Sequence, residues 1–153
     1  MKRALVLMAI MLSFIGVRQM YAHCEVPCGI YDDPLRIALI REHITTIEKS
    51  MKMIVDLTGE DGKNYNQIVR WISNKEHHAE ELQHIVWQYF MTQRIKPAAA
   101  DDEEGRAAYL EQLTLLHELL IGAMKSKQTV DLTHVAAMRD VVDRFEASYL
   151  KGK

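Results

Sequence analysis

The only two cysteines of the chain lie four residues apart in the segment YAHCEVPCGIYDDP, which runs from residue 21 to residue 34. A disulfide between Cys24 and Cys28 would close a very small loop, so it would remove little entropy from the unfolded chain. Thiolates are soft ligands that favour copper, zinc, nickel or iron–sulfur chemistry. The pattern therefore favours a metal site over a structural disulfide. Two thiolates alone are too few for a closed zinc site, which normally takes four protein ligands.

The residues before this segment have the pattern of a secretory signal. Lys2 and Arg3 precede an uncharged apolar run from residue 4 to residue 17, and Ala22 suits the last position before a cleavage site. A membrane-spanning helix needs about 20 apolar residues, so the run is short for an anchor that stays in place. We expect residues 1–22 to be removed by cleavage before His23, and the remaining 131 residues to be exported to the periplasm or the medium.

Cleavage at this position would supply the ligands that the two thiolates lack. The new α-amine of His23 would titrate near pH 8, so it could lose its proton and bind a metal at little cost. The amine and imidazole of His23, the backbone nitrogen of Cys24 and the thiolates of Cys24 and Cys28 would then form one mixed nitrogen and sulfur set. Such a set suits Ni(II) or Cu(II) in tetragonal geometry more than zinc.

Two amphipathic segments follow the cysteines and are predicted to be helices. Asp32-Asp33-Pro34 is typical of a helix start, with an acidic N-cap before a proline. The first helix has apolar residues every three or four positions, at Ile37, Ile40, Ile44, Ile47, Met51 and Ile54. The second begins near Asn64 and ends at Lys96-Pro97. Its apolar stripe comprises Ile68, Ile72, Ala79, Leu82, Val86 and Tyr89.

Two more helices are predicted after an acidic linker at residues 97–102. The third has a stripe of Leu110, Leu113, His117, Leu120 and Met124, and it ends with Lys125 and Lys127 near the negative end of its dipole. The fourth is capped by Asp131 or Thr133, and its stripe comprises Val135, Met138, Val142, Phe145 and Tyr149. No segment alternates with period two. The sequence therefore predicts an all-α, up-and-down four-helix bundle at residues 33–151, preceded by a metal-binding hook at residues 23–31, in one domain at residues 23–153.

The charge of the chain argues against a nucleic-acid partner. The formal net charge is −2, and no cluster of lysines and arginines is interleaved with aromatic residues. Removal of the leader changes the net charge to −5, because Lys2, Arg3 and Arg18 leave without any acidic residue. We expect no nucleic-acid partner, and no membrane association once the leader is removed.

The segment HCEVPCGIYD at residues 23–32 resembles the nickel-binding hook of the nickel-containing superoxide dismutases, whose pattern is H-C-x-x-P-C-G-x-Y. The close resemblance covers about ten residues, and the run from Lys75 to Pro97 resembles the second helix of that family more loosely. The resemblance implies the same four-helix fold and an enzyme that disproportionates superoxide to oxygen and hydrogen peroxide. It also implies one nickel ion per subunit, cycling between Ni(II) and Ni(III), and assembly as a homohexamer.

Carried over by position, the resemblance implies a role for each residue of the hook. His23 would supply its amine and an axial imidazole, Cys24 its amide nitrogen and thiolate, and Cys28 the second thiolate. Pro27 would follow a cis peptide bond, and Tyr31 would stand near the open axial side of the metal as a catalytic residue that limits access. The family supports its axial imidazole with a carboxylate and an arginine. Ala38 and His78 stand near those positions here, so the support of His23 is not predicted.

Two alternatives are left open by the sequence. Glu81-x-x-His84 fits half of a carboxylate-bridged di-iron motif, and Asp131-x-x-His134 is a near relative of it, although such a centre needs two proper copies. A non-enzymatic exported carrier could use the same hook to bind and release nickel or copper. We expect the polar run at residues 76–81 to face solvent or another subunit, and His117 to be a buried core residue.

Overall fold

The computed structural model describes residues 32–59 and 64–151, and these residues form helices and no strand. The elements are α2 (Asp33–Gly59), α3 (Tyr65–His84), η1 (Ile85–Arg94), α4 (Glu103–Gln128) and α5 (Thr133–Leu150). η1 continues α3 directly, in a wider helical register. The predicted all-α fold is confirmed, whereas the leader and the hook at residues 23–31 lie outside the described residues.

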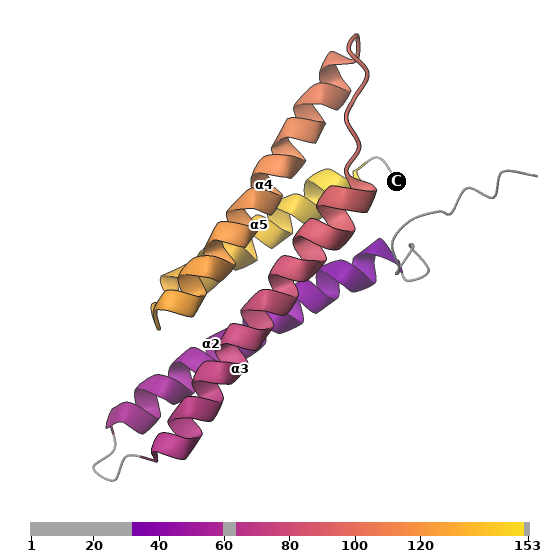
Figure 1. The fold of residues 1–153 in the computed structure, drawn as a ribbon. Helices are drawn as coiled ribbons and strands as arrows, with labels where there is room; N and C mark the ends of the chain where they lie inside the picture. Colours follow the sequence, from indigo (N-terminus) through magenta and orange to yellow (C-terminus); the bar gives the residue numbers. More distant parts are fainter. Residues whose placement is uncertain (1–31, 60–63, 152–153) are drawn as a thin grey trace, which may run out of the picture.

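The helices form two antiparallel hairpins that pack against each other (Figure 1). α2 pairs with α3 and α4 pairs with α5, while α3 contacts α4 and α2 contacts α5. Each helix therefore lies beside its neighbours in sequence, as predicted for an up-and-down bundle. The first turns of α4 extend beyond the other helices, whereas the start of α2 and the end of α5 lie at one end of the bundle (Figure 1).

The core confirms the predicted stripes of the first and fourth helices. Fully buried side chains line α2 at Ile37, Ile40, Ile44, Ile47 and Met51. At the end of the bundle near η1 the core becomes aromatic. Phe90 packs edge-on against Phe145 and Tyr149 of α5, with ring centroids 5.0 and 5.5 Å apart. Aromatic pairs in this arrangement contribute more than their buried area alone, so this end of the bundle is firmly packed.

The predicted stripe of the third helix is only partly confirmed, because Leu113 and Leu120 pack against the core as partly buried residues and the other three members are exposed. The side chains of α4 that are buried are instead Leu115, Leu116, Leu119, Ala123 and Ser126. Leu110 and Met124 are 52% and 42% exposed, and His117 is exposed, so it is not a core histidine. α4 has apolar residues on two sides, and packing against α3 and α5 buries only one of them. Ile72 of the predicted second stripe is also exposed, at 41%.

Buried Lys75 closes the C-terminal end of α4. Its ammonium group donates to the carbonyl oxygens of Ser126 at 2.6 Å, of Lys127, and of Thr129 at 3.3 Å. The last carbonyls of a helix have no partner within the helix, and a positive charge is favourable there. Lys75 therefore ties α3 to the end of α4.

Side chains accept backbone hydrogen bonds near the starts of α3, α4 and α5. Asn64 accepts a hydrogen bond from the backbone of Gln67 before α3, and Asp102 accepts one from Gly105 before α4. Asp131 accepts one from the backbone of Thr133 at 2.9 Å, at the start of α5. Among the described residues, no helix is both long enough and apolar enough to cross a membrane.

Candidate functional site

The predicted metal ligands His23, Cys24 and Cys28 lie outside the described residues, as do Pro27 and Tyr31. The structure describes the platform to which they are joined. The carbonyl oxygen of Asp32 accepts the first hydrogen bond of α2 from the backbone of Leu35 at 3.0 Å. The candidate site is therefore built from the end of the bundle at which the chain enters α2.

A buried carboxylate joins three elements at this end. Asp33 is only 8% exposed. Its Oδ1 accepts hydrogen bonds from the hydroxyl of Tyr89 at 2.6 Å and from Nε of Arg94 at 2.8 Å, and its Oδ2 accepts one from the hydroxyl of Tyr149 at 2.9 Å. We call these four residues the Asp33 cluster. A buried charge is costly unless it is paired and hydrogen-bonded, and this cluster meets both conditions.

The wide register of η1 brings two of these donors to the same side. The backbone N–H of Ile95 bonds to the carbonyl of Phe90 at 2.9 Å, a separation of five residues. Residues five apart therefore lie nearly above one another, and the Arg94 guanidinium lies 5.4 Å from the centre of the Tyr89 ring. Such π-helical segments are rare and are frequent at functional sites.

The charges of the Asp33 cluster are fixed near neutral pH. Burial, reinforced by the hydrogen bond to Asp33, raises the pKa of Tyr89 to about 12, so its hydroxyl remains a donor. Burial alone would lower the pKa of Arg94, but the hydrogen bond and the charge of Asp33 outweigh it and leave that pKa raised. Asp33 and Arg94 therefore form an ion pair to which the hydroxyl of Tyr89 donates.

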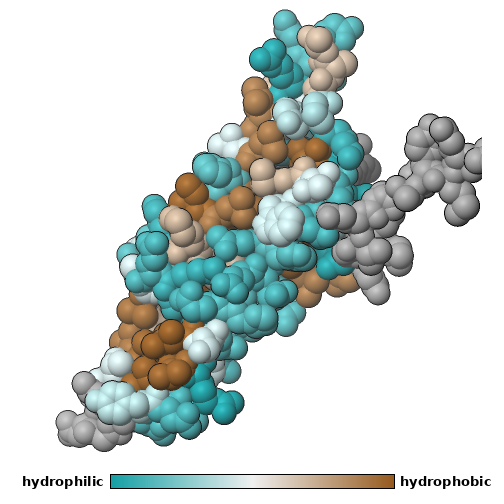
Figure 2. All heavy atoms as spheres, viewed as in Figure 1, coloured by the Kyte–Doolittle hydropathy of each residue, from teal (hydrophilic) through white to brown (hydrophobic). Residues whose placement is uncertain are grey.

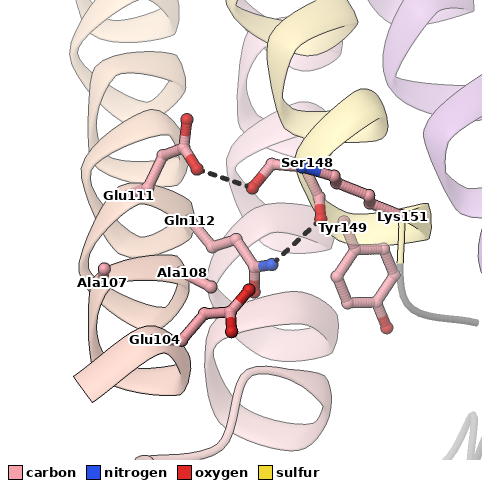
Figure 3. Close-up of a pocket in the computed structure, with 8 residues that line it drawn as sticks. All are labelled: Glu104, Ala107, Ala108, Glu111, Gln112, Ser148, Tyr149 and Lys151. Carbon is pink, nitrogen blue, oxygen red and sulfur yellow. Dashed lines mark hydrogen bonds between the residues drawn. The ribbon is translucent and has the colours of Figure 1, made fainter.

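An open groove of about 850 Å³ lies beside the cluster, between the projecting part of α4 and the end of α5. Figure 3 shows Tyr149 at its edge and hydrogen bonds that join the two helices. Ser148 donates to the carboxylate of Glu111 at 2.9 Å, and Gln112 donates to the carbonyl of Ser148 at 3.4 Å. Two carboxylates, of Glu104 and Glu111, line the groove together with one lysine. An anionic substrate would be repelled there.

The two positions predicted to depart from the family pattern lie on neighbouring helices. Ala38 is exposed on α2. His78 of α3 is half-buried, and its Nδ1 lies 2.9 Å from Nδ1 of His43 on α2, so one ring donates a hydrogen bond to the other. Burial lowers the pKa of His78, and the neighbouring His77 lowers it further. His78 is therefore no substitute for a permanently charged arginine.

The bundle does not bring together ligands for a di-iron centre. Across residues 32–59 and 64–151, no group of three or more His, Cys, Asp and Glu side chains is placed to hold a metal ion. Glu81 and His84 are exposed, and the His84 ring packs edge-on against Trp87. Asp131 accepts a hydrogen bond from the backbone of Thr133 at the start of α5, as described above. The residues behind the di-iron alternative therefore have other roles in the described structure.

Sequence reasoning missed the Asp33 cluster. The available signals were the acid before Pro34, which was expected to cap the first helix, and two tyrosines, Tyr89 and Tyr149, on predicted core stripes. The side chain of that acid, Asp33, bonds to other helices. A buried tyrosine hydroxyl usually needs a hydrogen-bond partner. These signals indicate that partners exist without indicating which residues they are.

Comparison with known families gives one result. A family model described as nickel-containing superoxide dismutase matches residues 18–153. The match takes in every described helix as well as the segment that contains both cysteines. No curated protein and no solved structure matches the chain.

Proposed function

Because the chain belongs to the nickel-containing superoxide dismutase family, we propose that His23, Cys24 and Cys28, at the N-terminus of the mature protein, hold its nickel ion. The family makes the protein an oxidoreductase that uses nickel to disproportionate superoxide into oxygen and hydrogen peroxide. The observation that carries the proposal about the ligands is the position of the cysteines. The chain contains two cysteines only, and they stand at positions 24 and 28 beside a histidine.

The donor set of this segment fits redox-active nickel. When bound, nickel supplies a centre that alternately takes one electron from superoxide and gives one back. Aqueous nickel holds its electrons too tightly for this reaction, whereas anionic sulfur and amidate donors stabilise the higher oxidation state. The thiolates of Cys24 and Cys28 would provide that stabilisation, and the amine and imidazole of His23 would complete the donor set. One nickel ion per subunit follows from one such segment per chain.

Tyr31 is the residue that we propose to limit access to the metal. It precedes Asp33, the first residue of α2, by two positions in the sequence. Superoxide is an anion that approaches a mature chain of net charge −5, so cations close to the site must attract it. The guanidinium groups of Arg36 and Arg94 lie 5.2 and 5.4 Å from the centre of the Tyr89 ring. We assign the local attraction to Arg36, because the charge of Arg94 is balanced by its ion pair with Asp33.

We further propose that the mature protein assembles from copies of itself, as a homohexamer. Leu110, Ile121 and Met124 of α4 are 52%, 38% and 42% exposed, although all three are large and apolar. Figure 2 shows brown patches on the side of the molecule where α4 lies in Figure 1. Burying such a surface against another subunit is favourable.

We also propose that residues 1–22 are removed and that the protein is exported, because the α-amine of His23 exists only after cleavage.

One extra residue before His23 tests the proposed ligand set. An added alanine turns the α-amine of His23 into a backbone amide and moves the free amine one residue away from the two thiolates. The proposed donor set is then disrupted, so we expect the electron paramagnetic resonance signal of Ni(III) and the turnover of superoxide to be lost. A matched control carries the added alanine after Lys153 and should behave as the wild type. Full activity in the N-terminally extended protein would contradict the proposed ligands. Nickel binding without turnover in the unextended protein would instead indicate a carrier.

A further inference from the structure

We infer that Asp33 is a positioning residue for the reaction: its bonds to Tyr89, Arg94 and Tyr149 fix the direction in which the N-terminal segment leaves the bundle. This inference rests on the proposed nickel ligands. It assigns a role to a buried cluster that contains none of those ligands. The role follows from where the cluster lies along the chain and from what it connects.

The cluster lies within short reach of the proposed ligands. Cys28 precedes Asp33 by five residues, and an extended chain spans at most about 3.6 Å per residue, so the two Cα atoms are within about 18 Å of each other. Tyr31 is within about 7 Å by the same reasoning. A rotation of the first turn of α2 would therefore change the direction in which the short segment that carries the ligands starts from the bundle. Metal sites and catalytic groups must hold their geometry within about 0.5 Å.

The first turn of α2 is held by more than its own helical bonds. Asp33 bonds to Tyr89 and Arg94 on η1 and to Tyr149 on α5, which are 56, 61 and 116 residues away in the sequence. Helix ends commonly fray, because their terminal backbone groups lack intrahelical partners. Three long-range bonds to one carboxylate instead fix both the position and the rotation of this turn.

Stability alone does not require a charge at this position. A buried ion pair often contributes no more to stability than well-packed apolar residues of similar volume, and its best-attested benefit is to select one conformation. Tyr89 and Tyr149 also pack in the aromatic core against Phe90, so the two phenol donors are held rigidly. The cluster is thus built to define one geometry at the root of the N-terminal segment.

Replacing Asp33 by asparagine in the nickel-loaded mature protein tests this role. Asp33→Asn keeps the shape of the side chain and removes its charge. We expect close to one nickel ion per subunit and an unchanged helical content, because the ligands and the core remain. We expect the Ni(III) resonance signal to broaden into more than one species, and kcat to fall by at least about tenfold, because misplaced ligands impair the reaction. Tyr149→Phe removes one donor and should give a smaller change of the same kind.

Lys75→Met provides the matched control. Like Asp33, Lys75 is a buried charged residue with three hydrogen-bond partners, but it lies at the C-terminal end of α4, away from the Asp33 cluster. Its loss should weaken the bundle and leave the Ni(III) signal unchanged. A wild-type signal and rate in both Asp33→Asn and Tyr149→Phe would overturn the inference. If Asp33→Asn does not fold, Asp33→Glu and Tyr149→Phe test the inference in its place, by the Ni(III) resonance signal and kcat. Absence of the Ni(III) signal in the wild type would refute the proposed ligands instead, so the two failures are distinguishable.

Discussion

The imidazole rings of His43 and His78 meet between α2 and α3 with their Nδ1 atoms 2.9 Å apart. One nitrogen must carry a hydrogen and the other a lone pair, so the contact exists only while at least one ring is neutral. Burial lowers the pKa of both histidines, and each is influenced by neighbouring charges from His77, Glu42 and Glu81. The contact therefore makes the packing of α2 against α3 depend on pH.

We predict that acidification weakens the bundle through this pair. The pKa of each ring is lowered in the folded protein, so below about pH 6.5 the unfolded chain takes up protons that the folded chain does not. The stability that the pair provides is thus present above about pH 6.5 and is lost as the pH falls from there toward the folded pKa values. Chemical unfolding of the metal-free protein at several pH values measures this, because thiolate sites release metal in acid.

His78→Asn isolates the contribution of the pair. Asparagine can still bond to His43 but does not titrate, so the free energy of unfolding should depend less on pH than in the wild type. His117→Asn is the matched control, because His117 is exposed on α4 and the substitution has the same helix propensity cost. An equal pH dependence in the wild type and His78→Asn would show that the pair does not couple pH to stability.

Lys75 is predicted to be important for stability and not for catalysis. Lys75→Met leaves the carbonyls of Ser126 and Lys127 without their buried donor, at a cost of roughly 3 kcal/mol in the free energy of unfolding. Thermal unfolding of the nickel-loaded protein measures this loss. Lys49→Met on α2 serves as a comparison. Because Lys49 is exposed, this substitution should change the free energy of unfolding only a little. A loss below about 1 kcal/mol in Lys75→Met would contradict the role given to its hydrogen bonds.

The apolar periodicity predicted helix packing well where it was unambiguous. In α2 the stripe from Ile37 to Ile54 is the one strongly apolar side of the helix, and the structure buries it. In α4, apolar residues occupy two sides, and periodicity cannot say which of them faces the bundle. The packing of α4 against α3 and α5 decides, and it exposes Leu110 and Met124. A surface left apolar in this way is the feature that supports the proposed assembly.

The sequence indicates chemistry only where it is local. The histidine and two cysteines of the hook stand within six residues, so their types and spacing favour a metal site for Ni(II) or Cu(II), and this stays a prediction because the hook lies outside the described residues. The Asp33 cluster instead joins residues up to 116 positions apart. In the sequence, a buried acid at the start of a helix looks the same as a capping acid, and only the fold separates the two roles.

Replacing either thiolate should remove the metal chemistry and leave the fold intact. In Cys24→Ser and Cys28→Ser we expect loss of the Ni(III) signal and of superoxide turnover, because a hydroxyl is a poor ligand for nickel. The helical circular dichroism signal should be unchanged, since both cysteines precede α2. A collapse of helical content in either variant would contradict the separation of hook and bundle.

Tyr31→Phe is predicted to change the kinetics more than the metal content. The substitution keeps the ring and removes the hydroxyl, so nickel should still bind at about one ion per subunit. We expect a changed turnover rate or a changed inhibition by hydrogen peroxide, as access to the metal is altered. Metal analysis with stopped-flow kinetics measures both quantities. A protein that contains no nickel would refute the proposed role of Tyr31, because it would make Tyr31 a requirement for binding.

The most direct test of the proposed nickel site is the intact mass of the mature protein, purified from the cells that naturally produce it and measured under native conditions. The account predicts a chain that begins at His23, with both thiols free of each other and one nickel ion per subunit. A chain that begins at another residue, or one whose cysteines form a disulfide without any nickel, would contradict it.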